Sequence, residues 1–190
     1  MCETAVRKGA NKTARYLAIN PTGKIPAFRV GESIITEAHA ILTWIGDNAP
    51  ERKLLPASQA GSLARIRAHE WMNYLSSTVH IAFRPFFRPA DLIGETGPID
   101  HLQAVGGPRF KATMLDFDRR LEGRRFALGE QFSVVDGYCF IFYLWSRLEA
   151  VRAWAPAMPN AAKHAECMLS RNSVTTVIAR EGFALPDGLV

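Results

Sequence analysis

Apolar and polar residues follow two different patterns along the chain, and the change between them falls close to residue 37. From residue 25 to residue 36, two short apolar runs flank Gly31 and Glu32, which predicts a β-hairpin closed by a tight turn. After residue 37, apolar residues recur every three or four positions, which predicts a series of amphipathic helices. The sequence therefore predicts a small region with a hairpin, followed by a helical region.

The predicted helices differ in length and in the residues that bound them. The spacing predicts helices over residues 37–48, 62–83, 108–122, 160–169 and 173–181, with a further helix that begins after Ser133. The helix over residues 108–122 is expected to begin at Pro108, and Gly123 is expected to end it in a left-handed conformation. Residues 90–108 are rich in glycine and proline and are expected to form a long loop with one helical turn.

Residues 48–56 carry the predicted boundary between the two regions. Pro50 and Pro56 stop helices, and each restricts the backbone of the residue before it. We therefore expect a first domain over residues 1–50 and an all-helical second domain over residues 57–190. A chain of 190 residues is long enough for one large or two small domains.

The helix that begins after Ser133 is expected at the centre of the second domain. Ser133 and Asp136 have the spacing of a capping box, and the residues after them are apolar on every face of the helix. The simplest interpretation of this pair is an ordinary helix N-cap. Gly137 departs from the pattern, because a glycine in a helix interior costs about 1 kcal/mol relative to alanine.

A proline and a helix N-terminus lie at the two ends of the predicted hairpin. Pro26 lacks an amide proton, so it can open a strand or lie at a sheet edge, and a cis peptide bond costs little before a proline. Glu37 stands at the start of the next helix, where the first amide groups lack partners within the helix. Such amides lie at the positive end of the helix dipole and suit a carboxylate ligand.

These residues resemble the N-terminal signature of the glutathione transferases. The signature runs Asn-Pro-x-Gly-Lys-Ile-Pro-Ala from Asn20 and continues as an apolar strand to Thr36 and Glu37. It ends in a helix with the pattern Ala-Ile-x-x-Trp-Ile from Ala40. The Gly-x-x-Phe-Ser/Thr-x-x-Asp pattern before the central helix is a second marker of the same family. The resemblance implies a thioredoxin-like domain joined to an all-helical domain.

The resemblance assigns roles in glutathione binding to four residues. Ile25, before a cis Pro26, would pair its backbone with the cysteinyl part of glutathione. Glu37 and Ala38 would hold the γ-glutamyl end. Many members of the family have serine in place of Ala38, so the hydroxyl contact would be lost here and only the amide kept. The alternative interpretation is an ordinary hairpin–helix unit with a cis-proline turn.

Residues 70–89 resemble the bacterial beta-class enzymes of this family. In those enzymes an asparagine and a histidine of this helix line the glutathione site, and Asn73 and His80 occupy the corresponding positions. The two are about two α-helical turns apart, on the same face. His80, the candidate catalytic residue, could stabilise a thiolate because a histidine titrates near neutrality. Ile81 replaces the basic residue that often follows this histidine, and the alternative is a histidine packed in a helix interface.

The resemblance also implies that part of the active site is missing. Residues 3–19 resemble the end of the second strand of a thioredoxin-like domain and the linker that follows it. The first strand, the first helix and the thiol-activating residue between them would then be absent. We expect an α+β chain, with a truncated thioredoxin-like domain (a β-hairpin plus a helix) before an all-α bundle, and weak glutathione binding. Cys2 is a candidate substitute for the activating group, but its place in the second strand disfavours it.

The leading functional hypothesis is conjugation of glutathione, as co-substrate, to small hydrophobic electrophiles. The helical domain would shape the acceptor site, with Phe83, Tyr138 and Trp145 as candidates, although core packing is the simpler role for each. The alternative is a non-catalytic transferase-like binding or scaffold protein, which the incomplete site, Ala38 and Ile81 would suit. The family also implies a homodimer, which would cover the exposed strand edges of a half-domain.

Composition and charge narrow the range of partners. A net charge of +5 and a pI of about 9.4 favour anionic small molecules such as glutathione. Nucleic-acid binding is not favoured, because the basic residues are scattered in runs no longer than a pair. The three cysteines have no metal-ligand spacing, so no metal is expected. No signal peptide or membrane-spanning run is recognisable, so we expect a cytoplasmic protein without membrane contact.

Overall fold

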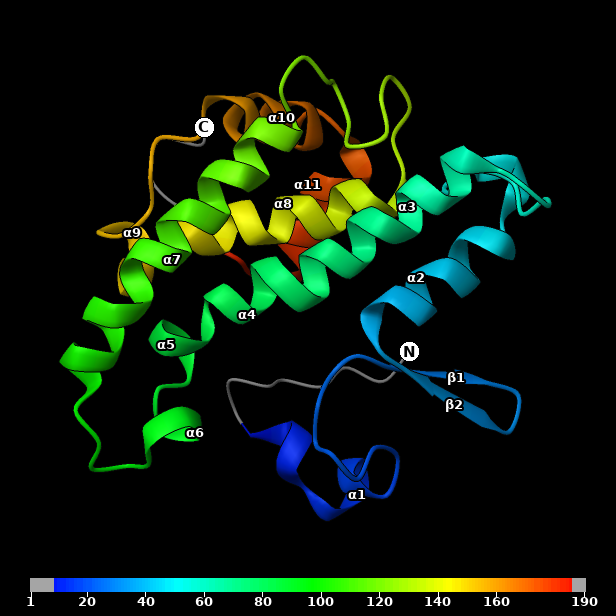
Figure 1. The fold of residues 1–190 in the computed structure, drawn as a ribbon. Helices are drawn as coiled ribbons and strands as arrows, with labels where there is room; N and C mark the ends of the chain where they lie inside the picture. The colour runs from blue at the N-terminus through cyan, green and yellow to red at the C-terminus, as the bar shows by residue number, and fades with distance from the viewer. Residues whose placement is uncertain (1–8, 186–190) are drawn as a thin grey trace. The chain divides into compact units, whose positions relative to one another are not determined.

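The computed structural model of the chain describes residues 9–185. These residues form two compact units that divide between Leu55 and Pro56. The first unit contains a two-stranded antiparallel sheet with short helices, and the second is built of helices (Figure 1). The predicted fold class, an α+β chain with a β-hairpin and a helix before an all-helical bundle, is confirmed.

The first unit is organised by a hairpin and one full helix. Its elements are η2 (Ala10–Lys12), α1 (Ala14–Leu17), β1 (Ala27–Val30), β2 (Ser33–Thr36), α2 (Ala38–Asp47) and η3 (Pro50–Arg52). Gly31, in the two-residue turn between the strands, has a φ of 57°, as a tight hairpin turn requires. The rings of Phe28 and Trp44 lie 5.0 Å apart and pack β1 against α2. Residues 10–17 form helical turns, where the sequence predicted only the end of a strand and a linker.

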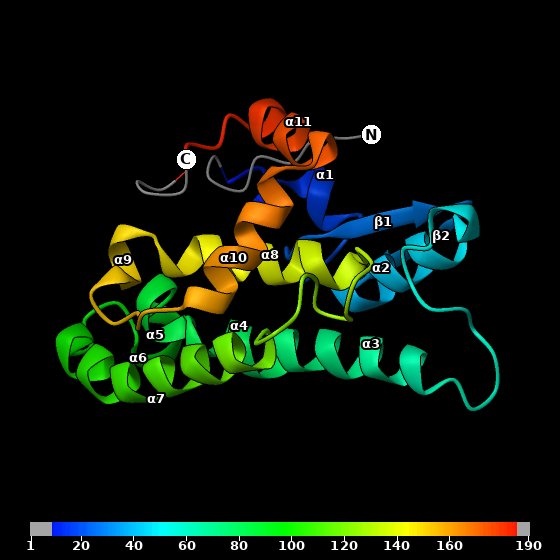
Figure 2. The same ribbon diagram turned by 90° about the horizontal axis from the view of Figure 1, so that it is seen from above.

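The second unit packs its helices in layers around one central helix. Its elements are α3 (Leu63–Tyr74), η4 (Leu75–Val79), α4 (His80–Ala82), α5 (Arg84–Phe87), α6 (Ala90–Ile93), α7 (Ile99–Arg120), α8 (Val134–Ser146), α9 (Glu149–Arg152), α10 (Pro159–Leu169) and α11 (Asn172–Glu181). Helix α7 runs beside η4, α4 and α5, while α8 packs on α3 and η4 (Figure 2). Helix α10 covers both α7 and α8. The central position of α8 is as predicted from its apolar sequence.

A buried carboxylate, that of Asp136, fixes the N-terminus of α8. It accepts the backbone N–H groups of Ser133 at 2.7 Å and of Ala127 at 2.6 Å, so the predicted capping box is confirmed. Nε2 of His164, on α10, lies 2.9 Å from the same carboxylate. Asp136 is fully buried and His164 almost so. One side chain therefore ties together the loop before α8, α8 itself and α10.

Helix α7 begins at Ile99, so the predicted start at Pro108 is wrong. A proline inside a helix clashes with the preceding turn and with the Cβ of the residue before it. The residue before Pro108 is Gly107, which has no Cβ. Gly107 also lets α7 approach the ring of Trp154, because a Cβ at this position would overlap that ring. Gly107 thus allows the helix to continue through the proline.

The predicted helix over residues 62–83 is interrupted. Ser62 caps its start by accepting the N–H of Arg65, as a serine at this position should. Residues Leu75–Val79 form a π-helical turn, and the N–H of His80 donates to the carbonyl of Leu75, five residues back. Periodicity did not reveal this turn, because the apolar residues on both sides keep α-helical spacing.

Within residues 9–185 no helix is both long and apolar enough to cross a membrane. In the same range, no three His, Cys, Asp or Glu side chains gather in a way that could hold a metal ion.

Replacing Asp136 by alanine should lower the free energy of unfolding by about 3 kcal/mol, because buried N–H groups and His164 would lose their acceptor. Asp100, in the exposed first turn of α7, provides the control: Asp100→Ala should change stability by less than about 0.5 kcal/mol. Urea unfolding of both variants measures the difference. Similar values for the two would show that the buried carboxylate does not stabilise the fold.

Gly137 and Gly107 should respond in opposite directions to replacement by alanine. At Gly137, in α8, a new Cβ would have no neighbour within 4 Å, so Gly137→Ala should stabilise the protein by about 0.5–1 kcal/mol. At Gly107 the new Cβ would overlap Trp154, so Gly107→Ala should destabilise it by about 2 kcal/mol. Thermal unfolding distinguishes the two. A gain in stability at Gly107 would contradict the packing described for α7.

Candidate functional site

The register of the hairpin brings the two halves of the sequence motif together. Ala27 pairs with Thr36, so the residues before β1 and after β2 lie at the same end of the sheet. Ile25 and Pro26 therefore lie beside Glu37 and Ala38. The Ile25–Pro26 peptide bond is cis, as predicted. Ile25, Pro26 and Glu37 are exposed, so this end of the hairpin is open to a ligand.

A turn stabilised by side chains holds the segment ahead of Pro26. Asn20 is buried; its Nδ2 donates to the carbonyl of Lys24 at 2.8 Å, and its Oδ1 accepts the hydroxyl of Thr22 at 2.8 Å. The hydroxyl of Tyr16 donates to the same Lys24 carbonyl at 2.6 Å. Gly23 has a φ of 63°, which disfavours a side chain, and a Cβ there would lie 3.2 Å from the carbonyl oxygen of Asn11. The Asn-Pro-x-Gly-Lys motif therefore forms a rigid turn.

Glu37 has an unusual backbone conformation. Its φ is 67° and its ψ is 122°, outside the regions that side-chain-bearing residues normally adopt. Strain of this kind costs of order 1–3 kcal/mol and is concentrated at binding and active sites. Glu37 also precedes α2, and its side chain does not cap that helix. The first amides of α2 consequently have no side-chain cap from Glu37 and can donate hydrogen bonds to an external carboxylate.

Asn73 and His80 lie in the second unit, and both are exposed. The imidazole of His80 packs on two rings of α8, with centroid distances of 5.6 Å to Phe142 and 5.4 Å to Trp145. The π-helical turn between the two residues adds one residue to the helix, so their spacing does not align them as it would in an α-helix. The expectation that they share a face therefore does not hold, because it assumed an unbroken α-helix.

The predicted acceptor-site residues differ in exposure. Phe83 is 1% exposed and contacts the rings of Phe87, Phe110, Phe142 and Trp145, so it belongs to the core. Tyr138 and Trp145 are half-buried, with the Tyr138 ring 5.1 Å from that of Phe142. Of the three candidates, Tyr138 and Trp145 can offer aromatic surface to a ligand.

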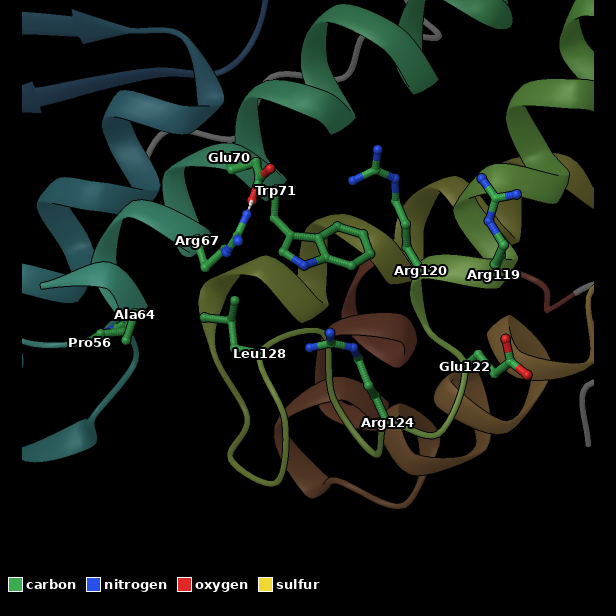
Figure 3. A pocket seen from close by; sticks show the side chains of 10 residues that line it. All are labelled: Pro56, Ala64, Arg67, Glu70, Trp71, Arg119, Arg120, Glu122, Arg124 and Leu128. Carbon is green, nitrogen blue, oxygen red and sulfur yellow. Dashed lines mark hydrogen bonds and ion pairs between the residues drawn. The ribbon is translucent and has the colours of Figure 1, made fainter.

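The second unit also contains a pocket of about 660 Å³ that the sequence did not predict. It is lined by residues of α3, of the end of α7 and of the loops before α3 and after α7, namely Pro56, Ala64, Arg67, Glu70, Trp71, Arg119, Arg120, Glu122, Arg124 and Leu128. The indole of Trp71 lies at its centre, with arginine side chains around it (Figure 3). No periodic pattern marks these residues, because they come from separate elements.

Carboxylates already neutralise most of the arginines of this pocket. Arg67 pairs with Glu70 at 2.6 Å, and the resulting hydrogen bond lowers the pKa of Glu70. Arg120 and Arg119 both pair with Asp116. Burial would raise the pKa of Asp116, but hydrogen bonds from Arg120 and Tyr74 outweigh burial and lower it. The pocket is therefore a network of paired charges rather than a preformed anion site.

The cysteines of the described residues do not resemble activated thiols. Cys139 is fully buried in α8, and burial raises the pKa of its thiol well above the ordinary value. An activated cysteine requires the opposite shift. Cys167 is half-buried on α10. Cys2, the candidate substitute for the activating group, lies outside the described residues.

The comparisons with known proteins agree with this architecture. The residue profile of "Glutathione S-transferase, N-terminal domain" matches residues 2–47. The curated protein "Glutathione S-transferase GstA" of Escherichia coli O157:H7 is 28% identical over 169 residues, which cover 88% of this chain and 79% of that protein.

Two solved structures show the same similarity. A sphingomonad glutathione S-transferase complexed with glutathione is 32% identical, with a TM-score of 0.75 over 89% of this chain and 79% of that one. The beta-class glutathione S-transferase of Sphingomonas chungbukensis is 29% identical, with the same TM-score and coverage. With the domain profile, these likenesses show that the chain belongs to the glutathione transferase family and is similar to its bacterial beta class.

Proposed function

We propose that this protein conjugates the thiolate of glutathione to small hydrophobic electrophiles. In this reaction the glutathione thiol loses its proton, its sulfur forms a bond to an electrophilic carbon, and the leaving group departs with its electron pair. The observation that carries the proposal is the hairpin register, in which Ala27 pairs with Thr36. This pairing puts a backbone segment suited to a peptide ligand beside a helix N-terminus suited to a carboxylate.

Four residues of the first unit are proposed to bind the tripeptide. The backbone of Ile25, held before Pro26, would pair with the cysteinyl part. Glu37 would accept the α-amino group of the γ-glutamyl part, and the amide of Ala38 would donate to its carboxylate. The exposure of Glu37 and its strained backbone both support this role.

Residues of the second unit are proposed to act on the thiol and on the electrophile. Asn73 and His80 are assigned to the glutathione site by resemblance, with His80 stabilising the thiolate. Tyr138 and Trp145 are the proposed acceptor-site residues, because both leave part of an aromatic ring exposed.

We also propose that two copies of the chain form a homodimer in the cytoplasm. Leu63 and Ile66 of α3 and Leu115 of α7 are exposed by 64%, 60% and 47%. Each of the three precedes, by one helical turn, a charged residue that lines the pocket of the second unit. A surface that combines apolar residues with charges of both signs can pair with itself around a two-fold axis. The free thiols of Cys139 and Cys167 are compatible with a reducing compartment.

Substitution of Glu37 should weaken glutathione binding without lowering the stability of the fold. Glu37→Gly should weaken glutathione binding at least about tenfold, because an ionic partner of the γ-glutamyl amino group is lost. The same change should leave stability unaltered or raise it by about 1 kcal/mol, because glycine relieves strain at positive φ. Lys53, the other described non-glycine residue with positive φ, is the control. Lys53→Gly should leave glutathione binding unchanged.

Calorimetric titration with glutathione and turnover of an aromatic electrophile measure these effects. If Glu37→Gly binds and conjugates as well as the unmodified chain, the γ-glutamyl assignment is wrong. If the unmodified chain shows neither binding nor turnover at millimolar glutathione, the proposed activity is wrong for this chain.

The homodimer should dissociate when the exposed apolar face is charged. Ile66→Lys should convert a dimer at micromolar concentration into a monomer, whereas Val177→Lys, at a similarly exposed position of α11, should not. Sedimentation equilibrium measures the mass directly. A monodisperse monomer for the unmodified chain would contradict the proposal.

A further inference from the structure

The π-helical turn of Leu75–Val79 lies directly before His80, the residue that we propose to stabilise the thiolate of glutathione. The N–H of His80 reaches the carbonyl of Leu75, one residue further back than in an α-helix. Such a turn contains one residue more than an α-helical turn. Every residue after it is therefore rotated by about 100° around the axis from its place in an unbroken α-helix.

Side-chain hydrogen bonds do not explain the turn. The hydroxyls of Ser76 and Ser77 both donate to the carbonyl of Asn73, at 3.1 and 2.7 Å. Bonds of this kind can open a helix. However, α11 contains the same arrangement: Thr175 and Thr176 donate to the carbonyl of Asn172 at 3.1 and 2.7 Å, and the helix remains α-helical. The two serines can therefore stabilise the wide turn but do not by themselves cause it.

Burial continues on both sides of the turn. Met72, before the turn, is fully buried, and Phe83 and Phe86, after it, are 1% and 6% exposed. In an unbroken α-helix, Phe83 would lie within about 20° of Met72 around the axis, so burial alone does not require an extra residue. With the extra residue, Phe83 instead packs between the rings of Phe110 of α7 and Phe142 of α8.

The rotation changes the surroundings of His80. In an unbroken α-helix, a residue seven positions after Asn73 would lie within about 20° of it, on the polar face. The extra residue turns His80 away from that face, and its imidazole instead contacts Phe142 and Trp145 of α8. His80 is exposed, and the half-buried Trp145 that its ring contacts is one of the two residues that we propose for the acceptor surface.

We infer that the π-helical turn is the positioning element for His80: its extra residue, rather than the spacing in the sequence, places the imidazole on the aromatic surface of α8. The role of His80 in the reaction rests on the proposed function. The position of its imidazole rests only on the π-helical turn and on the ring contacts with Phe142 and Trp145. A shift of one residue in either direction would present a different side chain to Phe142 and Trp145.

Deletion of one exposed residue of the turn tests this inference. Removing Thr78 should convert the segment into continuous α-helix while every residue after it keeps its place, because the deleted residue is the extra one. The variant should unfold at the same urea concentration as the unmodified chain or a higher one. Nuclear Overhauser contacts between the imidazole of His80 and the ring of Trp145 should persist, with His80→Ala used to assign the signals.

Two matched variants complete the test. Deletion of exposed Ala112 from the regular helix α7 should unfold the protein, because Met114 and Phe117 would rotate out of the core relative to Phe110. The double variant His80→Ala/Ile81→His moves the imidazole by one exposed position, and its contacts with Trp145 should be lost. Its turnover should fall as far as that of His80→Ala, roughly a hundredfold, whereas deletion of Thr78 should change turnover by less than about threefold.

The inference is overturned if the Thr78 deletion unfolds like the Ala112 deletion. It is also overturned if His80 loses its contacts with Trp145 in that variant, or if the displaced histidine keeps them. If the contacts behave as expected but no variant, including the unmodified chain, conjugates glutathione, the positional inference stands and the proposed function fails.

Discussion

Backbone pairing in one short hairpin fixes the geometry on which the candidate site depends. With Ala27 opposite Thr36, Ile25 and Pro26 lie next to Glu37 and the first amides of α2. A slip of one residue would turn every side chain of one strand to the other face and would separate the two segments. Each end of the hairpin is held independently, by the buried Asn20 turn before β1 and by the packing of Phe28 on Trp44. The strain at Glu37 can persist because the segments on both sides of it are fixed.

In the helical unit, the buried carboxylate of Asp136 fixes the position of the central helix α8. Asp136 joins the loop before α8, the first turn of α8 and His164 of α10, so the central helix and its cover share one acceptor. Because α8 is fixed in this way, Phe142 and Trp145 form a firm surface against which α4 and its His80 can pack. The sequence marks the capping box clearly, but His164 is separated from it by 28 residues, and no local pattern indicates their contact.

The sequence predicts local features of this protein better than features that depend on long-range packing. The hairpin turn, the cis Ile25–Pro26 bond and the Ser133 cap are confirmed, because a few adjacent residues determine each of them. Gly123 has the predicted left-handed conformation, although α7 already ends at Arg120.

The start of α7 and the π-helical turn were not predictable by the same reasoning. Pro108 normally marks a helix boundary, and only the contact of Gly107 with Trp154 shows why α7 continues through it. The π-helical turn leaves no mark in the sequence pattern, because the apolar residues before and after it keep α-helical spacing. The four residues assigned to the hairpin end lie together, whereas the roles of Asn73 and His80 remain predictions.

The most direct test of the central claim is a glutathione titration of the ¹⁵N-labelled chain, followed by the backbone amide signals. The account predicts the largest shift changes at Ile25, Ala27 and Ala38 and at the two amides after Ala38, because these groups lie at the shared end of the hairpin. Shifts confined to the arginine-lined pocket around Trp71, or saturable binding that leaves the hairpin end unchanged, would contradict it.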